Sequence, residues 1–222
     1  MNHDDLLSRP IVLVVALALV SLVPFAFMTV TAFVKIATVL QIVRSAIGAQ
    51  SIPSNNVIMA LAAALTLVAM GPVGDKMVAR AGPLLSGKTQ DTMTMVTQGI
   101  DAVREPLRAF LQKNASEKER ARFLSVARDA RPEADRASVG DGDLTVLVPA
   151  FVVTELTEAF AIGFLIYLPF LVIDLVVSNV LLALGMQMMS PTQVSLPFKL
   201  LLFVAIDGWG LLARALVAGY HG

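Results

Sequence analysis

Ionisable residues interrupt the apolar carboxyl-terminal third of the chain. Glu155 and Glu158 are three residues apart, so on a helix they share one face. Two carboxylates on one face could relay a proton or bind an ion. Asp174 and Asp207 could share a proton, as the paired aspartates of an aspartyl protease do. Lys199 follows in the same apolar surroundings and could pair with an acid.

The cost of burying these groups indicates how they must be covered. A charged side chain at the centre of a bilayer costs about 2.5–3.5 kcal/mol on insertion scales, so these residues must face protein or water. A chain of 222 residues offers few internal faces. We therefore expect an oligomer in which acids of one copy pair with Lys199 of a neighbour.

The sequence gives little support to other chemistry. Cysteine is absent, which excludes disulfides, thiolate catalysis and iron–sulfur sites. His3 and His221 lie at the two ends of the chain, and no glycine-rich phosphate-binding motif occurs. The formal net charge is zero, so no overall basic field attracts nucleic acid. We expect a protein that is not an enzyme, carries no cofactor or metal and binds no nucleic acid.

Two alternative classes use the same carboxylates. An ion-coupled carrier or channel subunit would bind or relay ions at Glu155, Asp174 and Lys199, on broken helices, although no repeat of two halves is evident. An intramembrane aspartyl protease would use Asp174 and Asp207. Neither aspartate lies in a recognisable catalytic motif.

The composition is that of a membrane protein. Hydrophobic residues make up 56% of the chain and charged residues 15%, and a soluble fold of this size could not bury that much apolar surface. Charge divides the chain into an apolar segment at 1–73, a polar segment at 74–144 and an apolar segment at 145–222. We expect an all-α fold of membrane-associated hairpins with interrupted hydrophobic helices and a small, helical polar segment between them.

The first apolar segment predicts a helical hairpin. The run from Pro10 to Val34 can cross a bilayer core of about 30 Å, and we expect Pro24 to kink it. The run is longer than the core of a signal peptide, which favours a retained helix. A second run, from Val57 to Val73, follows the sequence SIPSNN and is expected to end at Gly71-Pro72.

Local signals organise the rest of the chain. Ser116 and Glu119 form a capping-box pattern that predicts a helix from Glu117 to Arg128, and we expect an irregular loop over residues 129–143. In the last segment the uncharged runs are shorter than the roughly 20 residues of a membrane span. We expect prolines to divide this segment into interrupted helices rather than simple spans; they are Pro149, Pro169, Pro191 and Pro197.

Several uncommon sequence words occur in a recognisable order. They are PAFVVTELTEAFAIGF, IYLPFLVIDLVVSNVLLALGMQMMSP and LPFKLLLFVAIDGW in the last segment, and FVKIATVLQIVRSAIG followed by IPSNN near the start. The chain thereby resembles the FliP/SctR family, the export-gate subunit of flagellar and injectisome type III secretion systems. The short segment before Pro10 and the compact length favour an injectisome.

The resemblance implies an assembly. Copies of the subunit would form a pentameric ring and join the two other small export-gate subunits, SctS/FliQ-like and SctT/FliR-like, with larger export-gate and switch components around them. Unfolded secreted proteins would pass through the centre. The gate would lie in the bacterial inner membrane in contact with membrane lipid, with much of it, including residues 74–144, on the periplasmic side.

The resemblance also implies roles for individual residues. The pore constriction falls on Met186, Gln187, Met188 and Met189. Methionine suits a seal because its flexible thioether packs into an apolar plug and yields to any passing sequence. Gln187 departs from the methionine common there and would hydrate the seal. Glu155 and Lys199 look like partners in a salt bridge between subunits, and the other buried polar residues would be Glu158, Asp174 and Asp207.

Overall fold

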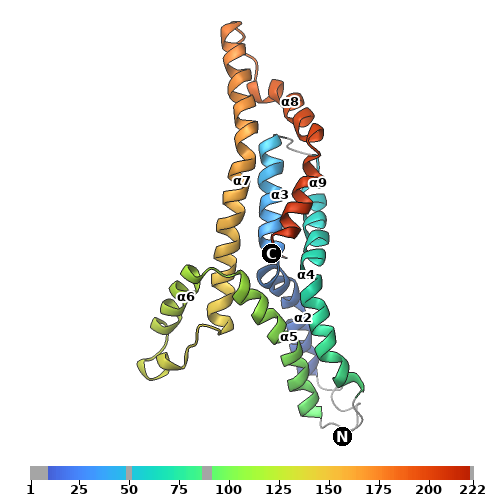
Figure 1. Ribbon diagram of the computed structural model, residues 1–222, viewed down its shortest axis with the longest axis vertical. Helices are drawn as coiled ribbons and strands as arrows, with labels where there is room; N and C mark the ends of the chain where they lie inside the picture. The colour runs from blue at the N-terminus through green and yellow to red at the C-terminus, as the bar shows by residue number, and fades with distance from the viewer. Residues whose placement is uncertain (1–9, 49–51, 87–91, 221–222) are drawn as a thin grey trace.

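The computed structural model describes residues 10–48, 52–86 and 92–220 of the chain. This part of the chain is helical and contains no strand, which confirms the predicted all-α class (Figure 1). In chain order the elements are α2 (Pro10–Val30), α3 (Phe33–Ile47), α4 (Asn55–Ser86), α5 (Thr92–Asn114), α6 (Glu117–Asp129), the 3-10 helix η1 (Glu133–Ser138), α7 (Leu144–Ala183), α8 (Pro191–Ala205) and α9 (Gly208–Ala218).

The first apolar run is two helices rather than one. The part of α2 from Val20 to Val30 meets α3 at an angle of 70°, with the break at Thr31 and Ala32. The Thr31 hydroxyl donates to the Phe27 carbonyl at 2.6 Å and accepts from the Phe33 N–H at 3.3 Å. These local bonds compete with the helical ladder at the bend. The predicted single run from Pro10 to Val34 is therefore wrong at its end.

Helix α4 continues past the predicted stop at Gly71-Pro72 and ends at Ser86. A proline inside a helix costs about 3 kcal/mol. Ala69 and Val73 are buried on either side of this dipeptide, in the core that α4 shares with its neighbours. Tertiary packing on both sides of the dipeptide offsets the local cost, so the helix is not broken.

The helix predicted after Ser116 is confirmed, but only the Ser116 half of the capping box forms, because the Glu119 carboxylate pairs with Arg122 instead. Ser116 precedes α6, and its hydroxyl accepts from the Glu119 N–H, while its own N–H donates to the Thr154 hydroxyl on α7 at 3.1 Å. The predicted loop over residues 129–143 instead contains η1. The Arg128 guanidinium donates to the Val139 carbonyl, which closes this segment back onto α6.

Helix α7 is continuous over 40 residues, so the prediction that prolines divide the last segment holds at Pro191 and is wrong at the other three. Pro149 and Pro169 lie within α7 and Pro197 lies within α8, whereas Pro191 begins α8. At about 1.5 Å per residue α7 is about 60 Å long, twice the thickness of a bilayer core. Apolar residues on both sides of each charged residue keep the mean hydropathy of α7 high. The short uncharged runs in the sequence therefore do not exclude a simple membrane span.

Among the described residues, two helices are long and apolar enough to cross a membrane. They are Asn55–Gly82 of α4 and the whole of α7. The bent pairs α2–α3 and α8–α9 raise the number to four if each pair counts as one span. Only 11% of an apolar 18-residue stretch of α7 is buried within the chain, so most of the apolar surface of this helix is available to lipid or partner helices.

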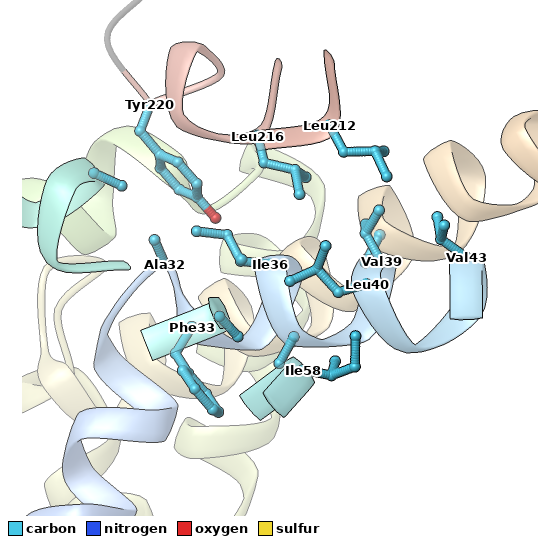
Figure 2. Close-up of a cluster of buried hydrophobic side chains, with 14 of the residues drawn as sticks. Ala32, Phe33, Ile36, Val39, Leu40, Val43, Ile58, Leu212, Leu216 and Tyr220 are labelled. Atoms are coloured by element: carbon cyan, nitrogen blue, oxygen red, sulfur yellow. The ribbon is translucent and has the colours of Figure 1, made fainter. Parts of the chain in front are cut away.

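The core is built around α3. Figure 2 shows side chains of Ile36, Leu40 and other α3 residues facing Ile58 of α4 and Leu216 of α9. The opposite side of α3 lies along α7 (Figure 1). The two backbones approach closely at Gly163, where a Cβ atom would come within 2.5 Å of Ile42 Cδ1. Helix α3 is therefore the element that aligns α7 with α4 and α9.

Candidate functional site

A buried lysine on α3 gathers the first pair of acids. Lys35 Nζ lies 2.9 Å from Glu155 Oε1 and 2.7 Å from Glu158 Oε2, and 4.6 Å from the centre of the Tyr220 ring. The Tyr220 hydroxyl donates to Glu155 Oε2. The side chains of Lys35 and Glu155 are 9% and 1% exposed, whereas that of Glu158 is 52% exposed. This lysine cluster joins α3, α7 and Tyr220, the second residue after α9.

A second charged cluster lies farther along α7. Lys199 Nζ on α8 is 2.5 Å from Asp174 Oδ2, and the Ser195 hydroxyl donates to Asp174 Oδ1 at 2.5 Å. Lys199 also donates to the Ala46 carbonyl at 3.2 Å. That carbonyl belongs to the last turn of α3, whose carbonyls lack helical partners and carry partial negative charge. Lys199 therefore caps α3 and neutralises Asp174 at once.

These contacts differ from the pairing expected from the sequence. Within one chain Glu155 is held by Lys35, and Lys199 by Asp174. The predicted bridge between Glu155 and Lys199 involves two copies, so it remains a prediction. The expectation that only a neighbour could cover these charges is wrong, because the chain supplies partners of its own.

Sequence reasoning missed the residues that complete the two clusters. Lys35 lies within the apolar run Phe33-Val34-Lys35-Ile36, so its burial could have been inferred from the argument that was applied to the acids. Ser195 lies four residues before Lys199, on one face of a helix, which was also a readable signal. The contribution of Tyr220 had no local signal, because its partner is 65 residues away in sequence.

Asp207 lies apart from both clusters. It is exposed in the single chain and occupies the left-handed region, with φ 52°, at the 58° bend between α8 and α9. Asp is among the few residues that tolerate this conformation. Glu158 is half-exposed, so the predicted burial of Asp207 and Glu158 is not met within one chain.

The methionine stretch forms the loop between α7 and α8, at the end of this long hairpin (Figure 1). The chain turns at Gly185, whose φ of +70° favours glycine. Met188 is fully exposed, and Met186 and Met189 are more than 40% exposed. Gln187 is exposed beside them. These methionine side chains form an exposed apolar loop. They do not fill gaps in the core, which is the ordinary role of methionine.

In the described residues, the buried charged side chains are engaged in ion pairs. In residues 10–48, 52–86 and 92–220, no group of three His, Cys, Asp or Glu residues could hold a metal ion. Asp174 is committed to Lys199 and Ser195, while Asp207 is exposed at the elbow between α8 and α9. His3 and His221 lie outside the described residues.

Long apolar helices joined by buried ion pairs define a helical membrane protein with most of its apolar surface uncovered. Within that class the chain belongs to the FliP family, whose sequence pattern matches residues 16–216. This confirms the resemblance found in the sequence words.

Curated relatives match nearly the whole chain. Hypersensitivity response secretion protein HrcR of Ralstonia nicotianae is 44% identical over 209 residues, covering 94% of this chain and 96% of the relative. Yop proteins translocation protein R of Yersinia pestis is 43% identical over 211 residues, covering 95% and 96%. Flagellar biosynthetic protein FliP of Bacillus subtilis is 37% identical over 220 residues, covering 99% and 96%.

Proposed function

We propose that this chain is a core subunit of the export gate of a bacterial type III protein-secretion system, and that copies of it surround the channel for unfolded exported proteins. Membership of the FliP family and the secretion and translocation proteins among its relatives support the assignment. The observation that carries the pore role is the exposed methionine loop at the end of the α7–α8 hairpin.

The loop has the properties of an adaptable seal. Exposed thioether side chains in water favour contact with one another, so loops from several copies would close an apolar plug. A passing polypeptide would displace them without requiring a particular sequence. Gln187 adds an amide that keeps water at this level. The subunit would catalyse no reaction, and the energy for transport would come from other components.

The proposed surroundings follow the family. The copies would form a pentamer in the inner membrane, with much of the gate, including residues 74–144, on the periplasmic side, and would join the two other small gate subunits and larger export components. The uncovered apolar surface of α7 supports such neighbours. Glu155 of one copy would meet Lys199 of the next. Glu155 would then leave Lys35 or share it, and Lys199 would leave Asp174 or share it.

Cysteine chemistry tests the pore role, because the natural chain has no cysteine. With Met188→Cys, mild oxidation in membranes should produce disulfide-linked copies, and a stalled export substrate carrying one cysteine should link to the same position. Val126→Cys is the control, because Val126 is exposed on α6, away from the loop. Equal linking at the two positions, or none at Met188→Cys in secreting cells, would contradict the proposal.

A second cysteine experiment tests the bridge between copies. Glu155 and Asp174 are 19 residues apart on one helix, which is about 28 Å, and Lys199 lies beside Asp174. A disulfide requires Cα atoms within about 7 Å, so the pair Glu155→Cys and Lys199→Cys cannot close within one chain. Linked dimers should therefore form only if these positions meet between copies, and monomers alone would refute the bridge.

A further inference from the structure

A groove of about 530 Å³ lies between α7 and the bent pair α8–α9. On α7 its wall is a single helical stripe from Glu158 to Phe170, and on the other side it is lined by α8 and α9 as far as Gly219. Apart from Lys35 and Glu158, the residues lining it are apolar or glycine. The groove therefore has one charged end and an apolar body.

Its dimensions suit one hydrocarbon chain. The thirteen residues from Glu158 to Phe170 span about 18 Å, and half of a bilayer core is about 15 Å. A helix about 10 Å wide, about 1,400 Å³ over that length, could enter the groove only in part. Ile206 and Leu211, which line the groove, are about half exposed, so it opens on the surface of the chain.

The charged end favours a cation. Lys35 is already shared between Glu155 and Glu158 and lies over the Tyr220 ring, so one ammonium faces two carboxylates. Of these carboxylates only that of Glu158 lines the groove, and it is half-exposed. A group with several N–H donors would complete its hydrogen bonding, whereas an anionic group would be repelled.

We propose that this groove binds one acyl chain of a phospholipid whose headgroup carries a primary ammonium, such as phosphatidylethanolamine, with the ammonium against Glu158. The two spans that form the groove, α7 and the pair α8–α9, are apolar enough to meet lipid. The site rests on the membrane class of the chain and does not depend on the proposed gate.

Native mass spectrometry of the full chain in detergent, with phosphatidylethanolamine or phosphatidylglycerol added at equal concentration, tests the site. The wild-type chain should retain phosphatidylethanolamine up to about fivefold better, which is the upper range for an exposed ion pair. Glu158→Gln should abolish this preference but not lipid binding itself. Ala215→Trp should fill the groove and reduce retention of both lipids, because Ala215 lines it and is exposed.

Ala218→Trp is the matched control on the same helix, since Ala218 is exposed but does not line the groove. Circular dichroism of each variant should show unchanged helicity. Equal retention of the two lipids by the wild-type chain would overturn the headgroup assignment. Wild-type retention in Ala215→Trp, or a co-purified polypeptide cross-linked at position 215, would overturn the groove as a lipid site.

Discussion

Replacing Lys35 by methionine should be among the most damaging single changes in the chain. Lys35 and Glu155 are 9% and 1% exposed, so the substitution leaves a buried carboxylate without its cation. Breaking such a pair typically costs about 3–5 kcal/mol. We expect the lower end, about 3 kcal/mol, because Tyr220 still donates to Glu155, and the half-exposed Glu158 can turn to water. That loss is a large part of the roughly 5–15 kcal/mol that stabilises a folded domain.

The free energy of unfolding, measured by denaturant titration in detergent micelles with circular dichroism, gives the assay. Lys118→Met on α6 is the control, because Lys118 is exposed and should change stability by less than about 0.5 kcal/mol. The double variant Lys35→Met/Glu155→Gln should recover most of the loss, since a neutral amide still accepts from Tyr220. A loss below about 1 kcal/mol for Lys35→Met, or no recovery in the double variant, would refute the intrachain lysine cluster.

The same assay checks three further predictions. Asp174→Ala should cost about 2–4 kcal/mol by leaving the buried α8 lysine unpaired, and Asp174→Asn should cost less; equal losses would contradict a charge effect. Gly163→Ala should cost about 1–3 kcal/mol, and Ile42→Ala should restore it in a double-mutant cycle, since the added Cβ meets Ile42. Gly208→Ala should cost a similar amount because its Cβ would overlap the Phe203 ring, and an unchanged unfolding midpoint would contradict this close packing at the bend between α8 and α9.

Much of the fold could be predicted because it depends on local signals. Ser116 fixed the start of α6 as its N-cap, because its hydroxyl accepts from the N–H of Glu119, three residues later. Gly185 and Pro191 bracket the methionine loop through their own backbone preferences, since one supplies a positive φ and the other begins a helix. Errors arose at prolines. Gly71-Pro72 and Pro169 are ordinary helix breakers, yet packing around α4 and α7 outweighs the cost of one missing hydrogen bond.

The sequence by itself determined that the chain is helical, that it is apolar enough for a membrane, that it belongs to its family, and that its charged residues need partners. Only the tertiary structure decided which partners those are. Lys35 reaches Glu155 across 120 residues of sequence and Lys199 reaches Ala46 across 153. Such pairs depend on how α3 lies against α7 and α8. Hydrophobic packing sets that arrangement. Because it is non-directional, the sequence around either residue does not indicate which partner the residue will meet.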